Sequence, residues 1–197
     1  MLVFFKERLV FLSVPKTGTT AYAKALSARA DMVISDPPSL KHLPVYRYNR
    51  FLRPLFAKVC HAEMELMAVM REPVSWLGSW YRYRQRPFLR GKPNGTHDLS
   101  FDEFVAAYAK GQRPAYANVG SQAQFLKRQP NGVGVDHLFR YEDQPRLQSF
   151  LKDRLSCEIT LDRVNVSPAA DLTLSAKVEE KLRRKCSEEF GLYDSIA

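Results

Sequence analysis

The feature that most constrains this chain is a short turn between an apolar run and a helix-like segment. The apolar run covers residues 9–12, and the turn at 13–20 reads Ser-Val-Pro-Lys-Thr-Gly-Thr-Thr. Gly18 has access to backbone angles that other residues disfavour, and the first amides of a following helix point outward at the positive end of its dipole. Because Lys16 adds a full charge, the pattern predicts a strand, an anion-binding turn and a helix.

The spacing of this turn differs from that of the nucleotide-triphosphate loop, G-x-x-x-x-G-K-[ST]. Here Lys16 precedes Gly18, and no glycine stands four to six residues upstream. The spacing therefore weakens an ATP or GTP interpretation. On the turn alone, an ordinary strand-to-helix connection that contains lysine and threonine stays open as the alternative.

A second segment combines a buried strand with an arginine. Residues 65–70, Glu-Leu-Met-Ala-Val-Met, read as a strand, and Arg71 follows directly before a helix that begins near Pro73. Nucleotide triphosphatases usually place a magnesium-binding aspartate at this point, whereas an arginine suits a phosphate held by a bidentate fork. Ser79 lies eight residues later, about two turns into the helix. Taken singly, a surface salt bridge and a solvated serine would explain both residues.

Together, the two segments resemble the sulfotransferases that use 3′-phosphoadenosine 5′-phosphosulfate (PAPS). Residues 15–20 resemble their 5′-phosphosulfate loop and 71–82 their 3′-phosphate segment, in which an arginine and a serine stand eight apart. Segments 138–143, 163–167 and 190–193 resemble later parts of the family in the same order, closer to its bacterial and membrane-enzyme-like branch. The resemblance implies PAPS as sulfuryl donor, no metal, and the cofactor-binding residues Pro15, Lys16, Thr17, Gly18, Thr19, Thr20, Arg71, Ser79 and Arg163.

The alternation of apolar runs and helical patterns predicts an α/β fold. Strands expected at 9–14, 32–34, 65–70 and 135–141 alternate with helices expected at 19–29, 44–58, 73–84, 145–155 and 174–189. Such alternation favours a parallel sheet with helices on both faces and a ligand site at the carboxyl ends of the strands. We expect one P-loop-like sulfotransferase domain over 1–197, with the 5′-phosphosulfate loop at 13–20, the 3′-phosphate segment at 71–79 and a mobile loop over the site at 86–99.

Sulfuryl transfer requires positioning, charge stabilisation and a base for the acceptor proton. Lys16 and the loop amides suit stabilisation of the transferred group and the leaving oxygen, and the lower charge of a sulfuryl group removes the need for metal. His42 follows the expected second strand, where one branch of the family places its catalytic histidine, and we take it as the base. A loop histidine that caps the next helix is the simpler alternative, and Asp36, Glu63 and His61 are alternative bases.

The charge balance is strongly basic. The chain carries 30 basic and 21 acidic residues, a net charge of +9, which suits a doubly phosphorylated cofactor. The densest basic stretch, 81–92, interleaves arginine with tyrosine. A solvated helix end explains it most simply, contact with cofactor or acceptor comes second, and nucleic acid third.

The composition indicates the cellular location of the protein and whether it is a globular or a membrane protein. An apolar content of 45% fits a soluble globular chain, and no apolar run reaches the length of a membrane helix. Charges at 6–8 interrupt the apolar N-terminus, and the three cysteines form no C-x-x-C pair, so we expect a cytoplasmic protein with free thiols.

The sequence leaves the acceptor and the class of activity open. A hydroxyl, or an amine, of a carbohydrate, lipid or small molecule fits the chemistry, and loops 36–60 and 86–99 are expected to form its pocket. The alternatives are a small-molecule kinase or nucleotide triphosphatase with a degenerate loop, and a non-catalytic nucleotide-binding module.

Overall fold

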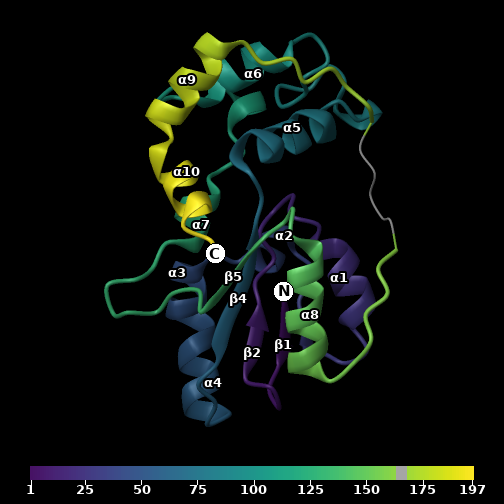
Figure 1. Cartoon of the computed structure of the whole chain (residues 1–197), viewed down its shortest axis with the longest axis vertical. Coiled ribbons are helices and arrows are strands. Elements are labelled where there is room, and N and C mark those ends of the chain that lie inside the picture. Colours follow the sequence, from purple (N-terminus) through teal and green to yellow (C-terminus); the bar gives the residue numbers. More distant parts are fainter. Residues whose placement is uncertain (163–167) are drawn as a thin grey trace. The chain divides into compact units, whose positions relative to one another are not determined.

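A computed structural model describes residues 1–162 and 168–197 and has an α/β fold (Figure 1). The described residues group into two compact units. Unit 1 comprises 1–71, 122–162 and 196–197, and unit 2 comprises 72–121 and 168–195. Unit 1 contains the sheet and the turn at 13–20, whereas the described part of unit 2 is helical.

The sheet of unit 1 has five strands in the order β3-β1-β2-β4-β5. Strands β2 (Leu9–Phe11), β4 (Glu65–Met70) and β5 (His137–Arg140) pair in parallel, with Leu9 beside Glu65 and Met67 beside His137. These three strands confirm the expected parallel core. Their carboxyl ends share one edge of the sheet, which is the edge where loops carry ligands in such folds.

One prediction about the sheet is wrong, because the sheet is mixed. Strand β1 (Leu2–Phe4) pairs antiparallel both with β2 and with β3 (Met32–Val33), so it lies between two strands that run the other way. The charged turn at 5–8 interrupts the apolar N-terminus, and three residues are too few to show a strand pattern. The turn joins β1 to β2 as a hairpin, so the apolar N-terminus forms part of the core.

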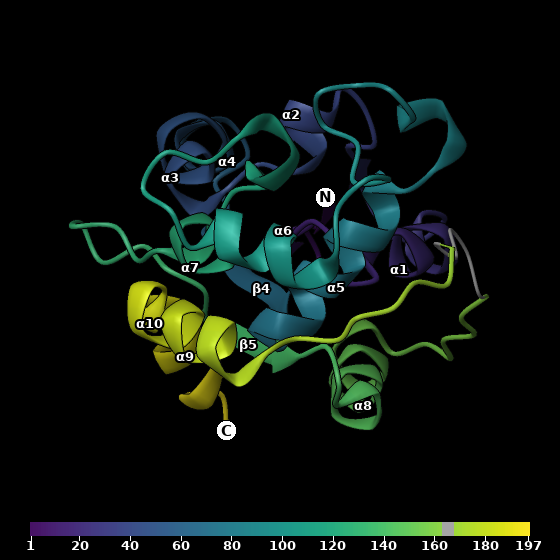
Figure 2. The same ribbon diagram turned by 90° about the horizontal axis from the view of Figure 1, so that it is seen from above.

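Helices cover both faces of this sheet (Figures 1 and 2). On one face, α1 (Thr19–Leu26) and α8 (Gln144–Leu155) bury Tyr22, Leu26, Leu147 and Leu151 against alternate residues of β2 and β4. On the other face lies a helical run made of α3 (Val45–Arg47), the π-helical turn η1 (Tyr48–Leu52) and α4 (Arg53–Val59). Two short helices, α2 (Pro38–Lys41) and α7 (Gln122–Leu126), complete unit 1.

Unit 2 is a cluster of helices around an aromatic core. Helices α5 (Pro73–Arg84), α6 (Phe101–Tyr108), α9 (Ala176–Lys185) and α10 (Ser187–Asp194) pack against one another (Figure 2). Trp76 packs against Tyr108 with ring centroids 6.2 Å apart, and both side chains are buried. Trp76 therefore serves the core. A capping box of Ser100 and Glu103 starts α6.

The loop at 86–99 forms hydrogen bonds with α5. It holds the 3₁₀ turn η2 (Pro87–Leu89), and the buried Thr96 donates its hydroxyl to the carbonyl of Tyr81 at 3.0 Å. The buried guanidinium of Arg84 donates to the carbonyls of Asn94, Ala115 and Asn118. A second 3₁₀ turn, η3 (Ala115–Ala117), lies beside these bonds.

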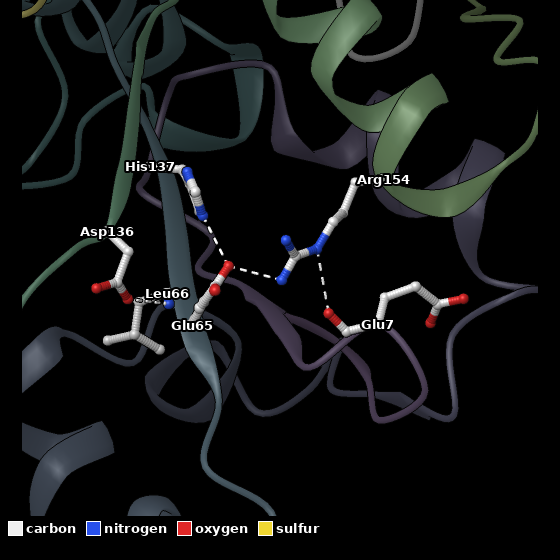
Figure 3. A network of polar contacts seen from close by, with 6 residues as sticks. All are labelled: Glu7, Glu65, Leu66, Asp136, His137 and Arg154. Atoms are coloured by element: carbon white, nitrogen blue, oxygen red, sulfur yellow. Dashed lines mark hydrogen bonds and ion pairs between the residues drawn. The ribbon is translucent and has the colours of Figure 1, made fainter.

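A polar network joins the amino ends of β4 and β5 to α8 (Figure 3). The Glu65 carboxylate accepts from Nε2 of His137 at 2.8 Å and from the guanidinium of Arg154 at 2.6 Å. Arg154 also donates to the carbonyl of Glu7, and Asp136 bonds the amide of Leu66. The hydrogen bond from His137, with the charge of Arg154 beside it, holds the pKa of Glu65 below its usual value.

Replacing Glu65 by glutamine is expected to reduce the free energy of unfolding by about 1 kcal/mol at neutral pH, since the side chains are partly solvated and water screens them. Because the pKa is lowered on folding, this stabilisation is complete above the usual glutamate value of 4.5 and disappears as the pH falls through the lowered value. Urea unfolding at neutral pH and at about pH 3 checks both expectations. Glu63→Gln is the matched control, because Glu63 meets Arg53 only at 3.5 Å on the surface. Equal losses in the two variants, or a loss independent of pH, would contradict the role of the network.

Candidate functional site

The turn between β2 and α1 is built on two left-handed residues. Lys16 has φ +66° and Gly18 has φ +74°, which together reverse the chain within three residues. A left-handed lysine costs about 1 kcal/mol, and such residues cluster at ligand sites. The hydroxyl of Thr17 is buried and donates to the carbonyl of Val14 at 2.9 Å, so it braces the turn from inside.

Gly18 is the N-cap of α1 and supplies no capping side chain. The first amides of a helix have no partners within the helix, so those of α1 are suited to an anion. Thr19 is buried, whereas Thr20 is half-buried and its hydroxyl accepts from Nζ of Lys41 at 3.4 Å. Lys16 and the start of α1 therefore belong to the same turn.

His42 lies beside this turn. Its Nδ1 is 2.7 Å from the carbonyl oxygen of Ser13, at the beginning of the turn. Since a carbonyl only accepts, Nδ1 carries the proton and the lone pair is on Nε2, as a general base requires. Burial lowers the pKa of His42, and the Lys41 charge acts in the same direction, while the bond to Ser13 opposes them. The imidazole therefore stays neutral at neutral pH.

The alternative bases lie elsewhere in unit 1. His61 and Glu63 directly precede β4, at the amino ends of the parallel strands, whereas the turn at 13–20 follows the carboxyl end of β2. Asp36 follows β3 and is exposed in the segment that leads to α2. Of the four candidates, His42 is the one whose side chain contacts the turn.

Arg71 is connected to the same turn by the ring of Tyr141, which lies between them. Its guanidinium lies 4.5 Å from the centroid of the Tyr141 ring, which follows β5. A Cβ atom on Gly18 would be 3.0 Å from Cε2 of Tyr141. Tyr141 thus lies against both Gly18 and Arg71, and it brings the ends of β4 and β5 together at the turn after β2.

The backbone of Arg71 is held by a buried glutamine. The amide of Arg71 donates to Oε1 of Gln122, and Nε2 of Gln122 donates back to the carbonyl of Arg71, both at 2.9 Å. Sequence reasoning missed this residue, because one glutamine at the start of a short helix carries no periodicity or motif. For Tyr141, the sequence indicated only that residues 140–142 brace the site from the next strand or form a buried ion pair, and it named no partner for the ring.

Two other cofactor residues expected from the sequence, Ser79 and Arg163, are not in the described part of unit 1. Ser79 is buried in α5 and belongs to unit 2, whereas Arg71 is the last residue of its stretch of unit 1. Glu72 caps the start of α5 by accepting from the amides of Val74 and Ser75. Arg163 lies outside the described residues.

The donor set in unit 1 is of the kind that binds an anion. It offers the Lys16 ammonium, the first amides of α1 and the Arg71 fork around one strand edge, and a neutral imidazole on the turn. In the described part of the chain, no three His, Cys, Asp or Glu side chains gather in a metal-binding arrangement. Nor does that part contain a helix long and apolar enough to cross a membrane.

Comparison with known proteins adds no assignment, since neither a family model nor a curated protein matches this chain.

Proposed function

We propose that this protein is a PAPS-dependent sulfotransferase built on a P-loop-like α/β fold. The observation that carries the proposal is that the ring of Tyr141 lies against both Gly18, in the β2–α1 turn, and the guanidinium of Arg71. An arginine at the end of β4 favours a second phosphate group over the magnesium ion of a triphosphatase. The donor carries both a 5′-phosphosulfate and a 3′-phosphate, which are the two anions that such a site would hold.

The donor supplies an activated sulfuryl group. The acceptor oxygen attacks its sulfur, the bond from sulfur to the 5′-phosphate oxygen breaks, and the acceptor proton passes to Nε2 of His42. Lys16 and the first amides of α1 stabilise negative charge on the transferred group and on the departing phosphate. The bond from Nδ1 of His42 to Ser13 fixes the tautomer and turns the basic nitrogen away from the backbone.

Calorimetric titration with 3′-phosphoadenosine 5′-phosphate, the spent donor, and with ATP tests this function. We expect micromolar binding of the bisphosphate, weaker binding of ATP, and loss of bisphosphate binding in Lys16→Ala and Arg71→Ala. Arg71→Lys keeps the charge but not the planar fork, so it should bind more weakly than the wild type.

The control is Lys152→Ala. Lys152 lies in α8 and forms a solvent-exposed ion pair with Glu158, so this variant removes one positive charge. It should bind the bisphosphate like the wild type, and circular dichroism should show that all variants are folded. Equal loss in Lys152→Ala would mean that the basic field alone attracts the ligand. ATP binding tighter than the bisphosphate, with magnesium-dependent turnover, would replace the proposal by a kinase or triphosphatase.

A further inference from the structure

The helical run at 45–59 has two apolar faces. The inner face is filled, because Val45, Tyr48 and Phe56 are buried. The outer face carries Phe51, Leu55 and Val59, which are 57%, 43% and 69% exposed. These three residues, called the outer stripe below, are spaced four apart and so form one line along the helix.

The π-helical turn explains why both faces exist. The amide of Arg53 bonds the carbonyl of Tyr48, five residues back, so η1 is wider than an α-helical turn. The wider turn keeps Tyr48 and Phe56, eight residues apart, on the same side with ring centroids 6.2 Å apart. The inner face is thus formed without the outer stripe, whose residues are not among the buried ones.

Positive charge surrounds the outer stripe. The helical run at 45–59 carries four cations, Arg47, Arg50, Arg53 and Lys58, and no aspartate or glutamate. The guanidinium of Arg50 lies 5.3 Å from the ring centroid of Phe51, and that of Arg47 lies 5.5 Å from the ring of Tyr46. Arg53 pairs weakly with Glu63 at 3.5 Å. The face is therefore apolar along its centre and cationic at its margins.

We propose that this face docks on an anionic lipid surface. An exposed apolar stripe with arginine and lysine beside it is the arrangement by which helices lie in the plane of a bilayer interface. The rings and aliphatic chains enter the acyl boundary, while the cations reach lipid phosphates, each contributing about a fivefold gain in affinity. This proposal does not depend on the proposed enzymatic function.

The charge pattern argues against the other occupants of such a face. A second copy would bring four cations against four cations with no carboxylate from 45–59 between them. Nucleic acid would use the arginines but would leave the outer stripe in water, since it offers no surface that buries leucine and valine. An anionic bilayer satisfies both parts of the face at once.

Sedimentation with vesicles of phosphatidylcholine alone, and of phosphatidylcholine mixed with phosphatidylglycerol, tests the proposal. The full chain should sediment with the mixed vesicles and not with the neutral ones, and added salt should release it. Phe51→Gln with Leu55→Gln should weaken binding by about tenfold. Arg47→Gln with Arg50→Gln and Lys58→Gln should weaken it by about a hundredfold.

Matched controls come from unit 2. Phe88→Gln removes an aromatic ring that is 54% exposed, and Lys177→Gln with Arg184→Gln and Lys185→Gln removes three exposed cations from α9. Both should bind like the wild type. The proposal is overturned by absence of sedimentation with either vesicle, by equal sedimentation with both, or by stripe variants that bind like their controls. Retention on poly-glutamate without vesicle binding would overturn it in favour of an acidic protein partner.

Discussion

Replacing His42 by alanine is expected to lower sulfuryl transfer by about 10²–10⁴-fold while leaving the affinity for the spent donor unchanged. The reason is that the His42 side chain contacts the turn through Nδ1, at 2.7 Å from the carbonyl of Ser13. Under the proposed function, its second nitrogen accepts the acceptor proton. Release of 3′-phosphoadenosine 5′-phosphate in the presence of a mixture of hydroxyl acceptors measures the rate, and calorimetry measures the affinity.

The pH dependence of the wild type provides a second readout of the same role. Burial lowers the pKa of His42 below the usual histidine value of 6.5, and the active form is the neutral imidazole. The rate should therefore rise through this lowered pKa and be at its plateau by neutral pH. In His42→Ala this rise should be absent.

His61→Ala is the matched control for this experiment. His61 is exposed and precedes β4 at the other end of the parallel strands, so its loss should leave the rate unchanged. Near-normal transfer by His42→Ala would contradict the assignment of the base, and Asp36→Ala would then be the next variant. Loss of donor binding in His42→Ala would instead give the histidine a structural role in the turn.

Replacing Gly18 by alanine is expected to reduce both stability and donor binding. The position has φ +74°, where an alanine costs about 1–2 kcal/mol. The new Cβ atom would also be 3.0 Å from Cε2 of Tyr141, so the ring has to move. Because the Arg71 guanidinium lies on that ring, we expect weaker binding of the bisphosphate by about tenfold or more.

Gly132→Ala separates backbone strain from the contact with Tyr141. Gly132 also has a positive φ, +85°, but a Cβ atom there would meet nothing within 4 Å. Urea unfolding should therefore show a loss of about 1 kcal/mol for Gly132→Ala and a larger one for Gly18→Ala. The control should bind the bisphosphate like the wild type. If both glycine variants lost the same stability and neither changed binding, Tyr141 would not connect the turn to Arg71.

Local pattern was sufficient for the elements that have their own signals. The apolar run at 65–70 and the proline at position 73 predicted β4 and α5 at the residues where they begin. The predicted final helix at 174–189 is instead two helices, α9 and α10, which meet at Cys186. Its charged, amphipathic pattern continues across the break, so the pattern alone did not reveal it.

The sequence by itself determined the turn after β2, because the turn depends on residues that are neighbours in the chain. It also determined the direction of the parallel strands, because the helices between them return the chain to the same end of the sheet. Tertiary structure alone decided that β1 lies between β3 and β2, that Tyr141 contacts both Gly18 and Arg71, and that Gln122 holds the backbone of Arg71. It also decided that Phe51 and Leu55 face outward, since the wider π-helical turn shifts the helical phase. These outcomes depend on which distant segments compete for the same buried surface, and no local spacing records that competition.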